Sequence, residues 1–325
     1  MAISGPASYV STTQMFITHW AACDTELGLG NHVAVTGGVV QAGLQALLND
    51  LSDRRTELQS DLTDEELARE DVEGRKTELL VRINQLNDRV RGVFAGSKFE
   101  RALKLVPSSN DAQSKFTDPL DGTARLWFRL NADPATAAAV TLQGAFTQAQ
   151  FVADIAALKA AYTTWTAAGV DAKITLEARD DIQDAIYAIL KDYRNAMPSH
   201  FVTGNALIDS LPQLTPAPGS TPDAVTATFA WDEVQQKVKI TFSLSAAADL
   251  FEYEIRFCAG PNYSTHLESV IGSVTAGSAR EFFTDVGLAN PGNIASFKVY
   301  VITTTGNEKG SNTLLVTRPM VVVPA

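Results

Sequence analysis

The stretch Leu211-Pro-Gln-Leu-Thr-Pro-Ala-Pro-Gly-Ser-Thr-Pro-Asp223 divides this chain into two regions of different composition. Its four prolines and one glycine are incompatible with a helix and favour an extended, fairly stiff connector. Alanine, leucine and charged residues at helical spacing dominate before it, whereas valine, threonine and phenylalanine alternate with polar residues after it. The sequence therefore predicts an α-helical region over residues 1–210, a proline-rich linker over 211–223, a β-sandwich over 224–319 and an apolar tail over 320–325.

Composition excludes several classes of protein. The 325 residues are 45% hydrophobic and 19% charged, which is too apolar for a disordered chain. Two cysteines are too few for a disulfide scaffold, and the net charge of −11 has the wrong sign for a nucleic-acid binder. Neither a membrane-spanning apolar run nor a signal-peptide pattern is recognisable, which leaves the cytoplasm and export by a non-classical route both open.

A heptad seam runs through the first half of the helical region. Its 4–3 spacing never changes phase, and eleven of its fifteen positions are apolar. Positions 44, 48, 51, 55, 58, 62, 65, 69, 72, 76, 79, 83, 86, 90 and 93 hold Leu, Leu, Leu, Arg, Leu, Leu, Glu, Arg, Val, Lys, Leu, Ile, Leu, Val and Val. One helix of this length would extend about 75 Å.

A second seam of similar span follows, and the two together predict a long antiparallel helix pair. It passes through Phe151, Ile155, Leu158, Tyr162, Trp165, Leu176, Ile186, Leu190, Tyr193 and Met197. Both seams weaken at mid-length, so an alternative is that they break into shorter helices near residues 60–63 and 169–171. Three shorter helices are expected around the pair, over residues 12–23, 99–105 and 121–130.

Seven strands are expected after the linker, over residues 225–231, 236–244, 250–258, 267–275, 279–285, 295–304 and 311–318. Their alternation of apolar and polar residues, as in Val238-Lys-Ile-Thr-Phe242, places one face of each strand inward. Seven short strands of this kind favour a two-sheet sandwich.

This region resembles a fibronectin type III domain. Tyr253-Glu-Ile-Arg-Phe257 is similar to that family's third strand, and Leu288-Ala-Asn-Pro-Gly292 before Phe297-Lys-Val-Tyr-Val301 is similar to its later signature. The segment 304–311 is similar to its last hairpin. Phe297 replaces the family's corner tyrosine, and Trp231 ends the first strand instead of lying in the second. The resemblance implies a spacing, adhesion or assembly role. The whole arrangement also resembles uncharacterised bacterial proteins that join helices to such a domain.

No catalytic, cofactor-binding or metal site is predicted, because the sequence lacks the common nucleotide, hydrolase and metalloprotease motifs. His19 and Cys23 are four residues apart, so a helix would place both on one face as a soft-metal pair needs, with His32 as a third candidate. Burial of Cys23 and Cys258 in separate cores is the preferred interpretation. A disulfide between these two cysteines would have to join the two regions.

Acidic clusters are interpreted as solvated helix surface. Residues 61–74 contain seven acids against Arg69, and Asp180, Asp181 and Asp184 form a second cluster. The segment Asp118-Pro-Leu-Asp121-Gly122 is expected to be a turn. Either cluster, or the turn, would otherwise be a candidate for cation binding.

The preferred hypothesis is a non-enzymatic structural protein that assembles with copies of itself into a filament, tube or layer, through helix–helix and sandwich or tail contacts. The alternative is a module that binds a glycan or another protein, with exposed loop aromatics such as Tyr263 as first candidates. An enzyme with an unfamiliar carboxylate site in the helical region is the third hypothesis. Neither nucleic acid nor a membrane is expected as a partner.

Overall fold

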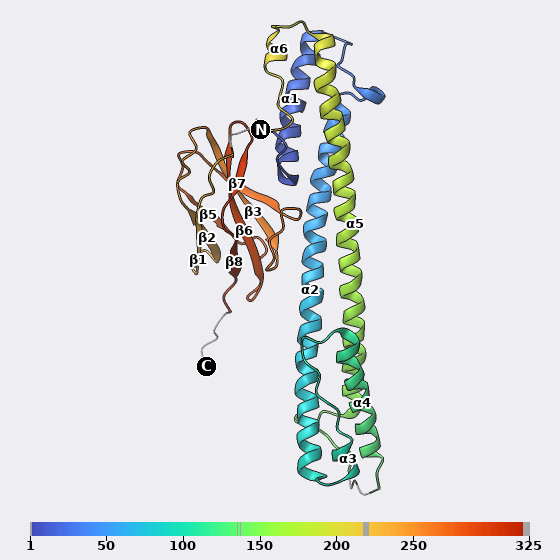
Figure 1. The fold of residues 1–325 in the computed structure, drawn as a ribbon. Helices are drawn as coiled ribbons and strands as arrows, with labels where there is room; N and C mark the ends of the chain where they lie inside the picture. The colour runs from blue at the N-terminus through green and yellow to red at the C-terminus, as the bar shows by residue number, and fades with distance from the viewer. Residues whose placement is uncertain (1, 135, 137, 217–220, 321–325) are drawn as a thin grey trace. The chain divides into compact units, whose positions relative to one another are not determined.

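The computed structural model describes residues 2–134, 136, 138–216 and 221–320, and these contain six α-helices followed by eight β-strands (Figure 1). The helices are α1 (Tyr9–Leu27), α2 (Gln41–Val93), α3 (Lys98–Arg101), α4 (Gln113–Asn131), α5 (Gln148–His200) and α6 (Ala206–Asp209). Two 3-10 turns, η1 (Pro6–Ser8) and η2 (Thr36–Gly38), flank α1. The order of elements confirms the predicted helical region followed by a β-sandwich.

The long helices α2 and α5 are continuous, with 53 residues each. Both expected break points, residues 60–63 and 169–171, lie inside them. The polar seam residues do not interrupt the helix because their side chains find partners. Lys76, for example, is buried but donates hydrogen bonds to Glu73 at 2.9 Å and to the Ser109 carbonyl at 2.8 Å. Of the two arrangements that the seams left open, the structure adopts the unbroken one.

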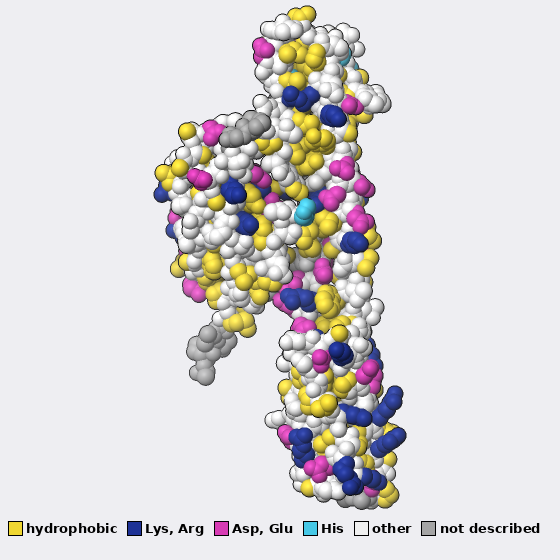
Figure 2. Space-filling model, viewed as in Figure 1, with side chains coloured by type: hydrophobic (Ala, Val, Ile, Leu, Met, Phe, Trp, Pro, Cys, Tyr) yellow, Lys and Arg dark blue, Asp and Glu magenta, His cyan; other side chains and the backbone are white. Residues whose placement is uncertain are grey.

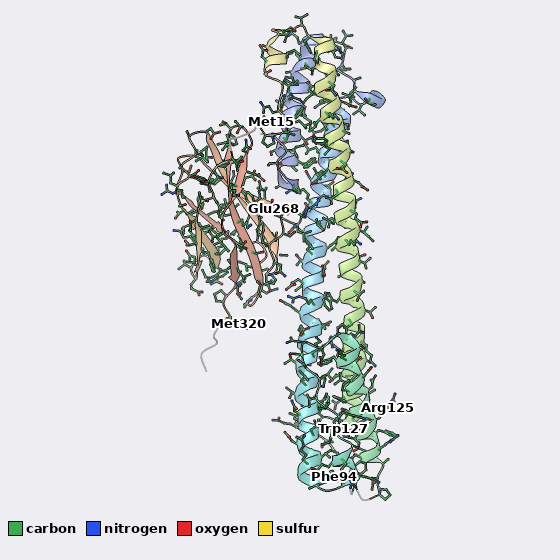
Figure 3. All side chains as sticks on the ribbon, viewed as in Figure 1. Met15, Phe94, Arg125, Trp127, Glu268 and Met320 are labelled. Carbon is green, nitrogen blue, oxygen red and sulfur yellow. The ribbon has the colours of Figure 1, made fainter. Side chains whose placement is uncertain are left out.

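The chain forms two compact units, and the boundary between them lies at the middle of the long helices. Unit 1 comprises residues 1–63 and 173–325, and unit 2 comprises residues 64–172. Unit 1 holds α1, the first part of α2, the last part of α5 and the sandwich, whereas unit 2 holds α4 with the remaining parts of α2 and α5. Each unit buries its own helical core, centred on Trp20 in unit 1 and on Trp127 in unit 2 (Figure 3).

The helical region is an internal duplication that the sequence analysis did not detect. The first repeat (residues 6–101) and the second repeat (residues 113–209) each consist of a short helix, a loop and a 53-residue helix. Gln148 begins α5 107 positions after Gln41 begins α2, and His200 ends α5 107 positions after Val93 ends α2. The same offset relates the buried seam residues: Leu44 and Phe151, Leu48 and Ile155, Leu51 and Leu158, Leu79 and Ile186, Ile83 and Leu190, Leu86 and Tyr193, and Val90 and Met197.

The loop before each long helix is held by the same two hydrogen bonds. The indole of Trp20 donates to the Val33 carbonyl at 3.0 Å, and that of Trp127 donates to the Val140 carbonyl at 3.0 Å. The amide of Val33 donates to Asp24 at 2.9 Å, and the amide of Val140 donates to Asn131 at 2.9 Å. The two repeats therefore share their detailed geometry as well as their order of elements.

The short helices differ from expectation in their bounds. Helix α4 begins at Gln113, so the expected turn at 118–122 is wrong: these residues lie inside the helix. Pro119 is the seventh residue of α4, beyond the first four amides that have no intrahelical acceptor, so the helix continues through it with the loss of one backbone hydrogen bond. Helix α1 ends at Leu27, as expected from the following glycines, and Gly28 has φ of 82°. Helix α3 is shorter than the expected helix over 99–105.

The strands form two antiparallel sheets (Figure 1). They are β1 (Ala227–Asp232), β2 (Lys237–Phe242), β3 (Leu250–Ala259), β4 (Ser269–Thr275), β5 (Glu281–Thr284), β6 (Ile294–Thr303), β7 (Glu308–Gly310) and β8 (Leu314–Thr317). One sheet has the order β1-β2-β5 and the other the order β4-β3-β6-β7, with β8 also paired to β6. The seven expected strands are present, and β7 is an additional short strand in the expected last hairpin.

Two predicted segments are described only in part. Residues 217–220 of the predicted linker and residues 321–325 of the predicted tail lie outside the described residues. On the face that Figure 2 shows, acidic and basic side chains are interspersed along the helices. Among the described residues, none of the helices combines the length and apolar character that crossing a membrane requires.

Candidate functional site

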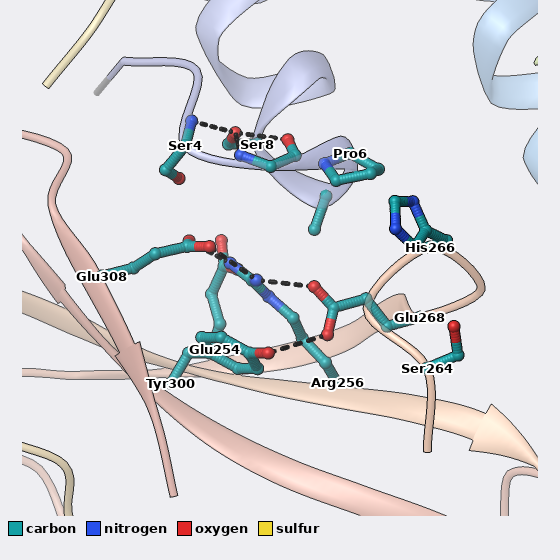
Figure 4. Close-up of polar contacts among 12 residues, drawn as sticks. Ser4, Pro6, Ser8, Glu254, Arg256, Ser264, His266, Glu268, Tyr300 and Glu308 are labelled. Carbon is teal, nitrogen blue, oxygen red and sulfur yellow. Dashed lines mark hydrogen bonds and ion pairs between the residues drawn. The ribbon is translucent and has the colours of Figure 1, made fainter. Parts of the chain in front are cut away.

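A buried charge cluster lies on the outer face of the larger sheet (Figure 4). Arg256 of β3 has a side chain only 1% exposed, and three carboxylates surround it. It donates to Glu254 of the same strand at 2.8 and 3.0 Å, to Glu268 at 2.9 Å and to Glu308 of β7 at 3.0 and 2.5 Å. Its guanidinium also lies 3.8 Å from the centre of the Tyr300 ring. All three acceptors are thus held by a single cation.

Two tyrosines complete the cluster. The hydroxyl groups of Tyr263 and Tyr300 both donate to Oε2 of Glu268, at 2.5 and 3.0 Å. Burial and the Glu268 carboxylate raise the pKa of both phenols, so they act as neutral donors. Burial alone would lower the pKa of Arg256, but the hydrogen bonds and charges of the glutamates raise it instead. Burial raises the pKa of Glu254, although Arg256 opposes this. The hydrogen bonds of this cluster therefore join β3 to the segment before β4 and to β7.

Within unit 1, the sandwich contacts the helices beside this cluster. The loop before β4 offers two carbonyl groups: that of His266 accepts a hydrogen bond from Arg179 of α5, and that of Leu267 accepts one from Gln59 of α2 at 3.2 Å. Arg55 of α2 is half-buried nearby, and desolvation, together with the charges of Arg179 and Arg256, lowers its pKa. The sandwich is therefore held by side chains on both long helices.

A cavity of about 620 Å³ remains at this contact. It is lined by Arg55, Thr56 and Gln59 of α2 and by residues of α1 on one side, and by Glu254 and Val270 of the sandwich on the other. We call the helical side of this cavity, residues 55, 56 and 59, the unit 1 surface.

Unit 2 has a corresponding surface, and its described residues include none of the β-strands. Tyr162, Thr163 and Thr166 of α5 lie 107 positions after the three residues of the unit 1 surface, and they line a cavity of about 430 Å³. We call these residues the unit 2 surface. The Tyr162 side chain is 5% exposed, and its hydroxyl has no hydrogen-bond partner among the described residues. A buried hydroxyl without a partner costs free energy.

The expected pair His19 and Cys23 does come together, and Tyr193 of α5 joins it in unit 1. The Cys23 sulfur lies 3.6 Å from Nδ1 of His19 and 3.2 Å from the Tyr193 hydroxyl, which is 2.8 Å from the same Nδ1. Burial raises the pKa of the Cys23 thiol and of the Tyr193 phenol and lowers that of His19. His32 does not take part, because it is exposed and pairs with Asp24 at 3.3 Å.

The other candidate residues lie apart. Cys23 and Cys258 are both buried free thiols, as the sequence analysis preferred, and burial raises the pKa of Cys258 to about 11. Asp180 pairs with Arg179 at 2.5 Å, and the neighbouring acids are exposed. Tyr263, suggested as an exposed aromatic, is partly buried with its hydroxyl on Glu268. Among the described residues, no three His, Cys, Asp or Glu side chains are placed to hold a metal ion.

Sequence reasoning missed the Arg256 cluster, Tyr193 and Tyr162 as features of interest. Glu254 and Arg256 lie two positions apart on one strand, a pattern that indicates an exposed polar face. The other two carboxylates of the cluster, Glu268 and Glu308, come from other segments of the chain. Tyr162 and Tyr193 were identified only as seam residues. The duplication carried the usable signal: each tyrosine replaces a different residue type, Arg55 or Leu86, at the same position of the other repeat.

Comparisons with known proteins identify no family for this chain. No family model matches the chain, and no curated protein matches it. Pectate lyase PelI from Erwinia chrysanthemi is 16% identical over 29% of this chain with a TM-score of 0.25, and the match spans only 28% of that enzyme. Pectate lyase Pel3 from Pectobacterium carotovorum is 13% identical over 29% of this chain and 27% of its own, also with a TM-score of 0.25.

The fibronectin type III resemblance also has a weak structural counterpart. A human FNIII domain is 26% identical over 34% of this chain and 87% of its own length, with a TM-score of 0.25. This match is compatible with a fibronectin-III-like C-terminal fold. The low TM-scores support no statement about activity.

Proposed function

We propose that this chain is a non-enzymatic structural protein that associates with copies of itself, the sandwich of one copy docking on the unit 2 surface of another. The observation that carries the proposal is the duplication: the chain has two equivalent helical surfaces and a single sandwich region. The unit 1 surface holds the chain's own sandwich, which leaves the unit 2 surface for a second copy.

The chemistry of the unit 2 surface suits such an occupant. In unit 1, the loop before β4 docks through the backbone carbonyls of residues 266 and 267, which accept hydrogen bonds from helix side chains. In unit 2 the positions of Gln59 and Arg179 hold Thr166 and Val72, so the donors there are the Thr166 hydroxyl and the unpartnered hydroxyl of Tyr162, which occupies the position of Arg55. Thr163, which is exposed and lines the same cavity, adds a third hydroxyl. Because the carbonyls of residues 266 and 267 are already engaged within their own chain, the incoming sandwich docks through main-chain carbonyls of another of its loops.

Docking between copies in this way is heterologous, because a sandwich meets a different surface of the next molecule. Each copy offers one sandwich and one vacant surface, so the contacts propagate into a ring or an open filament according to the rotation between neighbours. This agrees with the assembly role that the fibronectin-III resemblance implies.

Mass measurement by light scattering, from micromolar to millimolar concentration and with and without divalent cations, tests the proposal. Thr163→Arg fills the unit 2 surface and should abolish association. Thr164→Arg, on the neighbouring exposed residue outside the cavity, is the matched control and should behave as the unaltered chain.

Cross-linking between isotopically labelled and unlabelled copies identifies the surfaces that meet. Cross-links between the sandwich of one copy and residues near Tyr162 of another are expected. A chain that remains monomeric at every concentration would refute the proposal, as would association that Thr163→Arg leaves unchanged.

A further inference from the structure

We propose that one end of unit 2, where α2 ends and α3 and the last turns of α4 lie, binds the surface of an anionic lipid bilayer. Basic side chains and large apolar side chains are exposed there together. We call the exposed side chains of residues 89–105 and 124–133 the basic end. It shares no residue with the unit 2 surface, so this proposal does not depend on the proposed assembly.

The basic end has the opposite charge to the chain as a whole. Residues 89–105 and 124–133 contain seven lysine or arginine residues and two acidic residues, Glu100 and Asp133, whereas the net charge of the chain is −11. Each of these seven basic residues is exposed, and Figure 2 shows several basic side chains at this end of the helices. The net charge of the whole chain hides this local excess, which explains why a membrane partner was not expected from composition.

Most of these positive charges are not neutralised by the protein. Lys98 pairs with Asp133 at 2.6 Å, and Arg91 lies 3.8 Å from Asp88. The other basic residues of this end form no ion pair with a carboxylate among the described residues. Their positive potential therefore extends into the solvent and can attract a negatively charged surface, weakened only by salt.

The exposed face of α4 combines positive charge with apolar surface. Arg125, labelled in Figure 3, is three positions before Phe128 and four before Arg129, so the three side chains lie on one face of the helix. Lys104 lies beside this face, since its side chain would be 3.3 Å from a Cβ atom placed on Gly122. The charges come from separate segments that the fold brings to one place.

The apolar side chains of the basic end are well exposed. Leu105 is 89% exposed, Phe128 is 63% exposed and Val93 is 57% exposed. Side chains of this kind gain free energy when they enter the boundary between lipid headgroups and acyl chains. Each basic side chain near an anionic bilayer strengthens binding about fivefold. Together these are the two components of peripheral membrane binding.

The duplication indicates that packing of the helix does not require this face. The corresponding positions in α1, 107 residues earlier, hold Thr18, Ala21 and Ala22. The core side of the two helices is alike, because Trp20 and Trp127 are both fully buried. Unit 1 therefore builds the same helix with small uncharged residues at the positions where unit 2 exposes two arginines and a phenylalanine.

An anionic bilayer fits the basic end better than other anionic partners do. The phosphates of a nucleic acid would pair with the arginines but would leave Leu105 and Val93 in water. A second copy of this chain offers acidic side chains that already have basic neighbours, as Glu66 has in Arg69. Lipids present anionic headgroups directly above apolar chains, and so they satisfy both kinds of side chain.

Co-sedimentation of the full chain with phosphatidylcholine vesicles, with and without phosphatidylglycerol, tests the proposal. We expect binding only to the anionic vesicles, and its loss at about 1 M salt, where the Debye length falls to about 3 Å. R125Q/R129Q should weaken binding about 25-fold, because each removed charge contributes about fivefold. Phe128→Ser should weaken it about tenfold or more through the loss of inserted apolar surface.

R69Q/R75Q is the matched control, because it removes two arginine charges from another part of unit 2 and should leave vesicle binding unchanged. The altered positions of the basic end are exposed, so every variant should keep the helix content of the unaltered chain in circular dichroism. Absence of binding to anionic vesicles at low salt, or equal weakening by the control, would overturn the proposal. Tighter binding to an oligonucleotide than to vesicles, lost in R125Q/R129Q, would also overturn it and would assign the basic end to nucleic acid.

Discussion

Replacement of Arg256 by methionine should destabilise the sandwich strongly, because it removes the cation that is hydrogen-bonded to Glu254, Glu268 and Glu308. The guanidinium is 1% exposed and forms five hydrogen bonds of 2.5–3.0 Å to Glu254, Glu268 and Glu308. Breaking a buried ion pair from one side costs about 3–5 kcal/mol, since the remaining charges stay desolvated. We expect a loss of this size in the free energy of unfolding of the sandwich.

The loss should depend on pH in a defined direction. Burial already raises the pKa of Glu254 while Arg256 opposes the shift, so removal of Arg256 raises that pKa further above its unfolded value. A raised carboxyl pKa means that the folded state holds its proton more tightly, so the variant loses stability as pH rises through the folded pKa. The deficit should therefore be larger at about pH 8 than at about pH 5.

Hydrogen exchange followed by mass spectrometry measures the effect in the full chain, on peptides from β3 and β6. Lys239→Met is the control, because the Lys239–Glu281 pair is similarly close, at 2.6 Å, but well exposed, and should contribute at most about 1 kcal/mol. Replacing the three glutamates by glutamine together with Arg256→Met should restore most of the loss. A loss below about 1 kcal/mol in Arg256→Met, or one that grows as pH falls, would refute this account of the cluster.

Three further predictions concern the helical region, each measured by hydrogen exchange of the unit concerned. Burial lowers the pKa of His19 below its ordinary value of 6.5, so unit 1 should lose stability as pH falls below about 6.5, by up to about 1.4 kcal/mol per pH unit, and His19→Leu should remove this component. Asp24→Ala and Asn131→Ala each remove the acceptor of one buried loop amide. The free energy of unfolding should fall by about 1–3 kcal/mol, in unit 1 for Asp24→Ala and in unit 2 for Asn131→Ala. A loss of stability in the other unit would contradict the equivalence of the two repeats. Ala145 has φ of 57° where the first repeat has Gly38. Ala145→Gly should therefore stabilise unit 2 by about 1 kcal/mol, and Gly38→Ala should destabilise unit 1 by a similar amount. If both variants changed the free energy of unfolding in the same direction, backbone strain would not be the cause.

Regular spacing made the elements of this chain predictable. The first seam keeps its phase from Leu44 to Val93, and the helix is unbroken although it buries no apolar side chain between Leu58 and Val72. The strands were equally readable from their period of two, and the linker from its prolines. The expected turn at 118–122 was wrong because its proline and glycine resemble a turn, whereas the buried residues Phe116, Leu120 and Trp127 follow helical spacing through it.

The duplication was not recognised from the sequence because the two repeats share few identical residues. Both seams were visible, and the second is the first displaced by 107 residues, yet few residues are identical between them: Trp20 and Trp127, Val33 and Val140, and Gln41 and Gln148 are examples. A buried position requires only an apolar side chain of suitable size. The two repeats therefore differ in residue type while the same positions stay buried.

Local pattern, then, was determined by the sequence, because helix and strand periodicity depend on neighbours a few residues away. The contacts between distant segments were decided by tertiary structure alone. Arg256 meets Glu308 across 52 positions, and Cys23 meets Tyr193 across 170. The pairing of such residues depends on how the elements pack. From the sequence alone, Arg256 is interpreted as a surface charge and Tyr193 as a core aromatic residue. Only the packed structure places three carboxylates around one guanidinium, and a thiol, an imidazole and a phenol where unit 2 has leucines.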